Sequence, residues 1–447
     1  MRMRPLLLAL LLLHSPAVAW AQRVGIVSAV QRAIIERPTI LASQARNQAA
    51  ASAVREARSR YLPQLNFSET FSMTNEPAGS LFVALNQERN VMSPGSAYDL
   101  VDPDTQHDFE TRLTLKQILF DADTGYQIKE ANKRLESAQA RSAWSRESAG
   151  FAAFQAYLGV QGALADLQAV SSSEQEAGEL LRLADERYGA GIGLKADQLR
   201  ARVFRSETER RALTARNNLI IAQRRLALAV GQADGEIEIS APLDNSFFTS
   251  APATIPATER ADLQAFALEV ESLTFATKRS QAAYLPRIDA SASYGLHHES
   301  SPFGVDGEAW RLGAALNWEL FDGFRRDASI ARVSAEKAAA AAELSDARRE
   351  QTFRRAEVEL RIGEARAKKE SAAQGLAAAH ESQRLLQQRY ENGLADLVDL
   401  LATQSALDQA RSFLVVADIQ LLFSLGQALL EEGRFVATIL AKGEVAP

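Results

Sequence analysis

Small residues recur between Asp121 and about Tyr188 with spacings that alternate between four and three residues. This 3.5-residue repeat is the seam of an α-helix that winds left-handedly around neighbouring helices, and small side chains let the backbones approach closely. At 1.5 Å per residue the helix would be roughly 100 Å long, far more than a globular domain needs. A second such helix is expected from Asp322 to about Tyr390. The first seam consists of Ala131, Leu135, Ala138, Ser142, Ser145, Ala149, Ala152, Ala156, Gly159 and Ala163.

Shorter motifs indicate an internal two-fold repeat. Tyr61-Leu62-Pro63 recurs as Tyr284-Leu285-Pro286, and Leu119-Phe120-Asp121 recurs as Leu320-Phe321-Asp322. Repeated units of this kind cannot bury their own apolar faces and must pack on each other. The expected segments are a signal peptide (1–21), a first repeat (22–236), a Pro-rich linker (237–258), a second repeat (259–434) and a C-terminal tail (435–447).

Four stretches alternate apolar and polar side chains, which is the period of a β-strand with one apolar face. They are expected at about 64–73, 108–119, 287–296 and 309–320. Trp310 and Trp318 share a face of the last strand, and such residues mark the lipid interfaces of membrane barrels. Glu69 lies on the apolar face of the first strand and weakens its pattern. A soluble sheet with one face on a core would give the same alternation.

The first 21 residues have the pattern of a secretory signal, with Arg2 and Arg4, an apolar core at 6–13 and Ala19-Trp20-Ala21 before the cleavage point. A membrane anchor is the alternative, but the apolar core is too short to span a bilayer. Removal of the two arginines from the 50 basic residues leaves 48 against 56 acidic ones (48 − 56 = −8), which does not suggest a nucleic-acid partner. The chain has no cysteine, so no disulfide framework is expected.

The most apolar stretch after the signal is 413–430, and it could be read as a transmembrane helix. Asp418 interrupts it, and a charge in hydrocarbon is costly. Packing against other helices explains the same residues, since they form a seam with the same alternating spacing. This second seam consists of Leu400, Thr403, Leu407, Ala410, Leu414, Ala417, Leu421, Ser424 and Ala428.

Four strands cannot close into a cylinder, and an open sheet edge in lipid leaves backbone groups unpaired at several kcal/mol each. Two chains would give eight strands, whose interior side chains just fill, whereas three chains would give twelve strands and an open bore. Rotational symmetry would join the same two edges in every contact. The geometry therefore favours a homotrimer with a channel.

The order of these motifs resembles that of the TolC-type outer-membrane efflux proteins: signal, helix, Tyr-Leu-Pro, two strands, Leu-Phe-Asp, long helix, Arg-Tyr-x-x-Gly turn and return helix, all repeated once. The resemblance implies an α+β membrane fold, with a trimeric twelve-stranded β-barrel, four strands per chain, continuous with a long α-helical coiled-coil tunnel. It also implies a channel in the outer membrane of a Gram-negative bacterium that extends into the periplasm. The channel would be the exit duct of a tripartite efflux or type I secretion system. Its partners would be outer-membrane lipid, a periplasmic adaptor (membrane fusion) protein and an inner-membrane pump of the RND or ABC type.

The resemblance also suggests gate residues at the hairpin tips. In the family, an Asp six residues after the second turn glycine forms a ring in the lumen, and Asp399 occupies that position. A family tie between a Tyr and an Asp maps to Tyr390 and Asp197. The turns themselves, with Tyr188, Gly191 and Gly393, would form the tip on which the adaptor docks.

This chain departs from the family at two tip positions, and each site residue has a plainer interpretation. Ala402 stands where the family can carry a second ring Asp, and Ala395 stands where an Arg is sometimes found. Asp197 and Asp399 could instead be solvated acids near helix N-termini, which the helix dipole favours. Tyr188 and Tyr390 could simply staple the turns.

Two other functions are alternatives to a channel. An enzyme has little material here, with no cysteine, no glycine-rich phosphate loop and one histidine pair, His297-His298. The pair is expected at a strand end or in an outer loop, as a solvated feature rather than a metal site. We therefore expect no catalytic residue, metal or cofactor. A soluble periplasmic coiled-coil adaptor or scaffold is the other alternative, and it would fractionate with soluble proteins.

Overall fold

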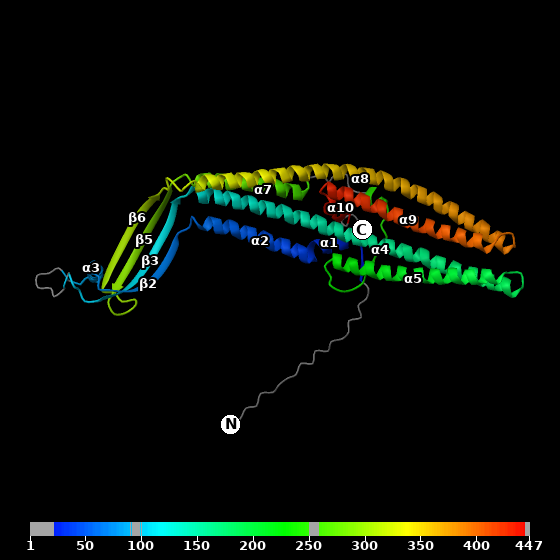
Figure 1. Cartoon of the computed structure of the whole chain (residues 1–447), viewed down its shortest axis with the longest axis horizontal. Helices are drawn as coiled ribbons and strands as arrows, with labels where there is room; N and C mark the ends of the chain where they lie inside the picture. The colour runs from blue at the N-terminus through cyan, green and yellow to red at the C-terminus, as the bar shows by residue number, and fades with distance from the viewer. Residues whose placement is uncertain (1–21, 90, 92–98, 100, 250–258, 443–447) are drawn as a thin grey trace, which may run out of the picture. The chain divides into compact units, whose positions relative to one another are not determined.

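The computed structural model describes residues 22–89, 91, 99, 101–249 and 259–442 (Figure 1). They fall into two compact units, and each unit takes segments from both sequence repeats. Unit one comprises 1–43, 142–261 and 349–447, and unit two comprises 44–141 and 262–348. The linker expected at 237–258 thus lies within unit one. The expected signal peptide and residues 250–258 and 443–447 lie outside the described residues.

Unit two contains a four-stranded antiparallel sheet in the order β2-β3-β5-β6 (Figure 1). Each strand overlaps a stretch where alternation predicted one. Neighbouring strands in the chain pair with each other, and β3 also pairs with β5, so β2 and β6 each keep one edge without a partner strand among the described residues. The strands are β2 (Gln64–Thr74), β3 (Gln106–Phe120), β5 (Arg287–His298) and β6 (Gly307–Asn317).

The register aligns apolar side chains in rows that cross all four strands, and these rows are exposed. One row is Phe67, Leu113, Tyr294 and Trp310, and the next is Leu65, Leu115, Ala292 and Leu312. The row between them, on the other face, is polar: Asn66, Thr114, Ser293 and Arg311. The exposed fractions in the first row run from 43% at Leu113 to 77% at Trp310. This apolar face has no core of its own chain to pack on, which the soluble-sheet alternative would require.

Glu69, which weakened the strand pattern, has a partner on the same face. Thr111 lies directly opposite it on β3, and the Thr111 hydroxyl donates a 2.5 Å hydrogen bond to the Glu69 carboxylate. Tyr294 donates in the same way to Glu308 across β5 and β6. The two carboxylates on the apolar face are therefore each held by a neighbouring hydroxyl, which lowers the cost of placing them there.

The last strand and the second long helix differ from expectation at their junction. β6 ends at Asn317, so Trp318 lies just beyond it and donates its indole N–H to the Tyr284 carbonyl at 3.0 Å. The helix α8 (Arg325–Glu391) begins three residues after the expected Asp322. Gly323 and Phe324 have φ values of 68° and 65°, a left-handed conformation that no α-helix contains. The equivalent α4 (Ala122–Gly189) begins as expected, with the Asp121 carboxylate bound to the Asp123 N–H at 3.2 Å.

The segment between the first two predicted strands contains a helix, α3 (Pro77–Asn86), which lies against β3 and β6 at one end of the sheet (Figure 1). The close approach depends on Gly307, where a Cβ would lie 2.0 Å from the Asn86 carbonyl oxygen. Gln87 then donates hydrogen bonds to the His107 carbonyl at 2.7 Å and to Asp108 at 3.0 Å. Residues 90, 92–98 and 100 of this segment lie outside the described residues.

The helices next to the sheet are joined mainly by ion pairs. α2 (Pro38–Ser59) leads into β2, and α7 (Ala261–Ala282) leads into β5. Lys133 of α4 pairs with Glu271 of α7 at 3.0 Å, and Arg279 of α7 pairs with Asp123 at 3.0 Å. Polar contacts of this kind hold helices that are too solvent-exposed to share a large apolar core.

Unit one has an apolar core where the N- and C-terminal segments meet α4. β1 (Gln22–Val24) pairs in parallel with β4 (Ile237–Ile239), and α1 (Ile26–Glu36) packs on α10 (Phe435–Ala441), a helix within the expected tail. Phe154 and Phe435 form its centre, with ring centroids 5.4 Å apart. Gly426 admits Phe154, since a Cβ there would lie 2.3 Å from its ring. A short helix, α6 (Ser246–Thr249), lies nearby in the chain.

Two helical hairpins extend from this core, α4 with α5 (Lys195–Ala229) and α8 with α9 (Leu397–Glu431). Among the described residues, α9 is the one helix long and apolar enough to cross a membrane by length and composition alone. Every member of its predicted seam, from Leu400 to Ala428, is buried or half-buried against protein. Packing therefore accounts for the seam, whereas Phe413 and Val416 beside it are 66% and 62% exposed.

Candidate functional site

The turns of the two hairpins have the same backbone conformation. Gly191 and Gly393 have φ values of 74° and 76°, which glycine adopts without strain. After each glycine the chain donates back to the helix that has just ended, Ile192 N–H to the Arg187 carbonyl at 3.1 Å and Leu394 N–H to the Arg389 carbonyl at 2.8 Å. These bonds are the six-to-one contacts of a Schellman C-cap. The glycines predicted from the motif do form the tight turns.

Tyr390 joins the two hairpins at the tip. It is 4% exposed and packs with residues of α4, α5 and α9, including Ala184, Phe204 and Leu400. Arg187, in the last turn of α4, lies over its ring with the guanidinium carbon 5.0 Å from the centroid. Burial raises the pKa of the Tyr390 hydroxyl, the positive charge of Arg187 opposes that rise, and the negative charge of Asp197 adds to it.

Asp197 lies in the first turn of α5, close enough to influence Tyr390. Its carboxylate accepts a hydrogen bond from Arg200 at 3.2 Å. Within the part of the chain that the structure describes, no hydrogen bond joins Asp197 to the Tyr390 hydroxyl. The fold thus brings the two residues of the expected tie near each other, while the bond itself stays a prediction.

Asp399 is an exposed acid in the first turn of α9. Its carbonyl accepts a hydrogen bond from Thr403, and among the described residues its carboxylate has no ion-pair partner. A solvated acid near a helix N-terminus and one member of a symmetric ring look the same in a single chain. The ring role of Asp399 therefore stays a prediction.

Tyr188, the repeat equivalent of Tyr390, has a different environment. It is 42% exposed, and the Lys195 ammonium lies 4.8 Å from its ring centroid within the same hairpin. Sequence alone treats the two tyrosines alike because their local motifs match. Only the packing of one hairpin on the other distinguishes them.

Large apolar side chains are exposed at the tips. Ile192 and Leu194 in the first turn are 70% and 66% exposed, and Leu394 in the second is 68% exposed. Apolar side chains gathered on one exposed surface mark an interaction site more often than scattered ones do. The tip thus presents a surface suited to another protein.

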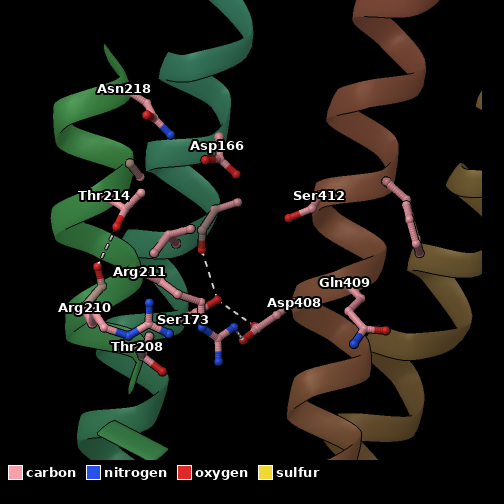
Figure 2. A pocket seen from close by; sticks show the side chains of 14 residues that line it. Asp166, Ser173, Thr208, Arg210, Arg211, Thr214, Asn218, Asp408, Gln409 and Ser412 are labelled. Carbon is pink, nitrogen blue, oxygen red and sulfur yellow. Dashed lines mark hydrogen bonds and ion pairs between the residues drawn. The ribbon is translucent and has the colours of Figure 1, made fainter. Parts of the chain in front are cut away.

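Farther from the tip, a polar cluster connects α4, α5 and α9. Figure 2 shows Asp408 extending from α9 toward Ser173 of α4 and Arg211 of α5. Ser173 donates to the Asp408 carboxylate at 2.6 Å, Gln404 donates at 3.1 Å, and Arg211 lies 3.6 Å away. The pKa of the Asp408 carboxyl is raised, chiefly by burial.

This cluster borders a cavity of about 360 Å³ that is lined by polar side chains together with Ala169, Val170, Ala215 and Phe413 (Figure 2). Sequence reasoning missed it because Asp408 sits beside the seam residue Leu407, where an apolar contact was expected. The available signal in the sequence was the acid–base pair of Asp408 and Arg411, three residues apart on the flank of the seam. The residues that line the cavity and are labelled in Figure 2 are Asp166, Ser173, Thr208, Arg210, Arg211, Thr214, Asn218, Asp408, Gln409 and Ser412.

The histidine pair lies at the end of a strand, one of the two places expected for it, but His297 is buried and not solvated. His297 is 5% exposed near the end of β5, and its Nδ1 lies 2.9 Å from the Asp108 carboxylate. The reason is α3, which covers this end of the sheet. Among the described residues, no group of three or more His, Cys, Asp or Glu side chains could hold a metal ion.

The described residues form an exposed apolar sheet whose two edges are unpaired among them, joined in one chain to long paired hairpins. This combination defines the subunit of a membrane channel that combines a β-barrel with a helical tunnel. Comparison with known proteins gives the same class. A profile of the family described as "Outer membrane efflux protein" matches residues 29–232 and 257–426, and the chain belongs to that family. The comparison with curated proteins finds no match.

Solved structures share the fold across nearly the whole chain. The outer membrane protein VceC of Vibrio cholerae is 19% identical with a TM-score of 0.76, and the match covers 91% of this chain and 96% of VceC. CusC is 14% identical with a TM-score of 0.79, covering 93% and 95%. The CmeC outer membrane channel of Campylobacter jejuni is 14% identical with a TM-score of 0.78, covering 92% and 86%.

The expected fold class and location are therefore confirmed: a trimeric twelve-stranded barrel, four strands per chain, continuous with a helical tunnel, in the outer membrane and extending into the periplasm. The expected function as an outer-membrane efflux channel is confirmed as well, and it fits better than a soluble adaptor or scaffold. The family is one of channels and not of enzymes.

Proposed function

We propose that the trimer is the exit duct of a tripartite efflux or type I secretion system, gated at its paired hairpin tips. The observation that carries the duct is the sheet, whose exposed apolar rows cross all four strands. Within the part of the chain that the structure describes, its edge strands β2 and β6 each have one edge without a partner strand. Three chains joined edge to edge would pair every backbone group in the lipid and leave a bore lined by the polar face.

The gate would lie at the tips, where Tyr390 of the second hairpin is buried against the first. Tyr390 and Asp197 would belong to the closed tip, and three copies of Asp399 would face one aperture. Like charges around a narrow opening attract multivalent cations. The supporting observations are the burial of Tyr390 between the hairpins and the exposure of Asp399.

The partner at the tip would be a periplasmic adaptor protein, which connects the duct to an inner-membrane pump of the RND or ABC type. The exposed side chains of Ile192, Leu194 and Leu394 support an apolar contact there. Tyr188, Gly191 and Gly393 would fix the shape of the surface that the adaptor meets, since both glycines need positive φ.

Fractionation of cells, followed by recording from the purified protein in planar bilayers, tests this function. We expect the protein in the outer membrane, a native mass in detergent of three chains, and discrete channels of low conductance. A folded monomer in the soluble fraction would contradict the proposal. To test the tip, Ile192→Ser with Leu394→Ser should weaken binding of the adaptor and leave channel formation unchanged.

A further inference from the structure

The last turn of α8 ends in backbone carbonyls that no later turn of the helix can bind, as at any helix C-terminus. The turn caps some of them, since the Tyr390 carbonyl accepts the Gly393 N–H at 2.9 Å, but each carbonyl oxygen has a second lone pair. These carbonyls also carry the negative end of the helix dipole, so a cation is favoured beside them. In this chain the cation comes from the other hairpin. The guanidinium of Arg187, on α4, donates to the Tyr390 carbonyl at 2.9 Å and to the Glu391 carbonyl at 3.4 Å.

The same guanidinium contacts the side chain of Tyr390 as well as its backbone. Its carbon lies 5.0 Å from the ring centroid, in the range of a cation–π contact. A terminal nitrogen of Arg187 also lies 3.6 Å from the point where a Cβ would stand if Gly393 had one, so the guanidinium reaches the turn itself. The Arg187 side chain of the first hairpin thus contacts the C-terminus of α8, the ring of Tyr390 and the turn at Gly393.

The repeat supplies an internal comparison. Arg389 takes the place of Arg187 in the second hairpin, within the same motif. Its guanidinium donates at 3.4 Å to the Leu394 carbonyl, which belongs to its own turn, and the residue is exposed. Equal positions in the repeat therefore do different things, since Arg187 joins two hairpins whereas Arg389 stays within one.

We propose that Arg187 is a positioning residue of the gate, a strap that holds the tip of the second hairpin against the first and must release before the hairpins separate. The inference rests on the proposed gating at the tips and adds a residue that ties them. Asp197 is the acidic group that faces the same tyrosine, and its charge competes with that of Arg187 there.

Single-channel recording of the full-length trimer in planar bilayers tests the strap. Arg187→Gln removes the charge and the stacked guanidinium, and we expect a severalfold rise in conductance. Arg389→Gln is the matched control and should leave conductance at the wild-type value. Arg187→Lys should give an intermediate value, because an ammonium can bind the carbonyls but cannot stack flat on the ring.

Chemical rescue separates the strap from a general loss of structure. The chain has no cysteine, so Arg187→Cys provides one reactive thiol. On channels already inserted in the bilayer, a cationic methanethiosulfonate reagent should lower the raised conductance, whereas a neutral reagent of similar size should not. Equal effects of the two reagents, or wild-type conductance in Arg187→Gln, would overturn the strap and leave the channel intact. A wild-type protein that forms no channels would instead overturn the proposed function.

Discussion

Arg411 of α9 holds Glu176 of α4 through two parallel hydrogen bonds, 2.9 and 2.8 Å long. Glu176 also accepts from Gln404, and the hydrogen bonds with Glu176 raise the pKa of the Arg411 guanidinium. A planar fork on a carboxylate is the strongest geometry available to an ion pair. The two hairpins of one chain are thus fixed to each other well away from the tip, so separation at the tip would pivot about this contact.

Glu176→Gln should destabilise the folded trimer by about 1–3 kcal/mol, because the largely buried guanidinium of Arg411 loses its bidentate partner. Its remaining acidic neighbour is Asp408, 3.8 Å away. Glu174→Gln is the control, two residues away on the same helix. Its carboxylate reaches Arg216 at 3.4 Å in a pair that is largely exposed, so its loss should cost less than ~1 kcal/mol. Thermal dissociation of the trimer measures both, and equal losses would contradict the argument.

The buried Asp408 predicts a dependence of stability on pH. Burial raises the pKa of this carboxyl in the folded state, so between the unfolded and folded pKa values the folded chain binds more protons. Asp408 therefore lowers stability as the pH rises through that window. At pH values above the folded pKa, Asp408→Asn should have a higher Tm than the wild type. The difference in Tm should vanish below about pH 4, where the carboxyl is protonated in both states. A variant less stable than wild type at neutral pH would refute this.

Asp399 is expected to bind multivalent cations at the aperture. Asp399→Asn should abolish block of single channels by such cations, because the ring would lose its three charges together. Asp396→Asn is the control, since it removes an exposed acid of the same turn, three residues earlier in the chain. Block that persists in Asp399→Asn would place the constriction elsewhere.

Two substitutions at Tyr390 separate its ring from its hydroxyl. Tyr390→Phe keeps the ring under Arg187, so alone it should change conductance little, whereas Tyr390→Ala should raise it. A rise in Tyr390→Phe combined with Asp197→Ala would show that the hydroxyl–carboxylate tie forms in the assembled channel. Single-channel conductance measures each variant, and a silent Tyr390→Ala would contradict any role for this residue in closing the tip.

The two faces of the sheet should tolerate charge differently. Leu312→Arg places a charge on the apolar face and should cost about 2–4 kcal/mol if the residue lies near the middle of the bilayer. Thr114→Lys puts a charge on the polar face, where Arg311 already occupies the same row, and should be tolerated. The yield of heat-modifiable trimer in the outer membrane measures both. Similar yields would argue against a lipid-facing role for the Leu312 face.

The long helices and strands could be predicted because their patterns repeat over many residues. The α9 seam from Leu400 to Ala428 is buried or half-buried at every position, and the strand alternation placed all four strands. Boundaries set by single residues could not be predicted. Phe324 adopts a positive φ that nothing in its type suggests, and it delays α8 by three residues.

The contacts between the two hairpins could not be predicted from the sequence either. Arg187 and Arg389 share a motif, so nothing local shows that one binds the neighbouring helix and the other its own turn. The same holds for Asp408, whose partners Ser173 and Arg211 come from two other helices that are distant in the chain. A sequence pattern predicts which residues share one face of a helix. The roles of these residues depend instead on which helix packs against that face.

The unpartnered edges of β2 and β6 have a genetic consequence. If each wall of the pore is completed by a neighbouring molecule, a faulty edge in one subunit also deprives an intact subunit of its seal. Cells that make damaged and normal copies together would then lose far more working pores than the damaged share of the protein suggests. Defects confined to the face of α3 or to the hairpin tips would leave the wall closed and behave as ordinary partial losses.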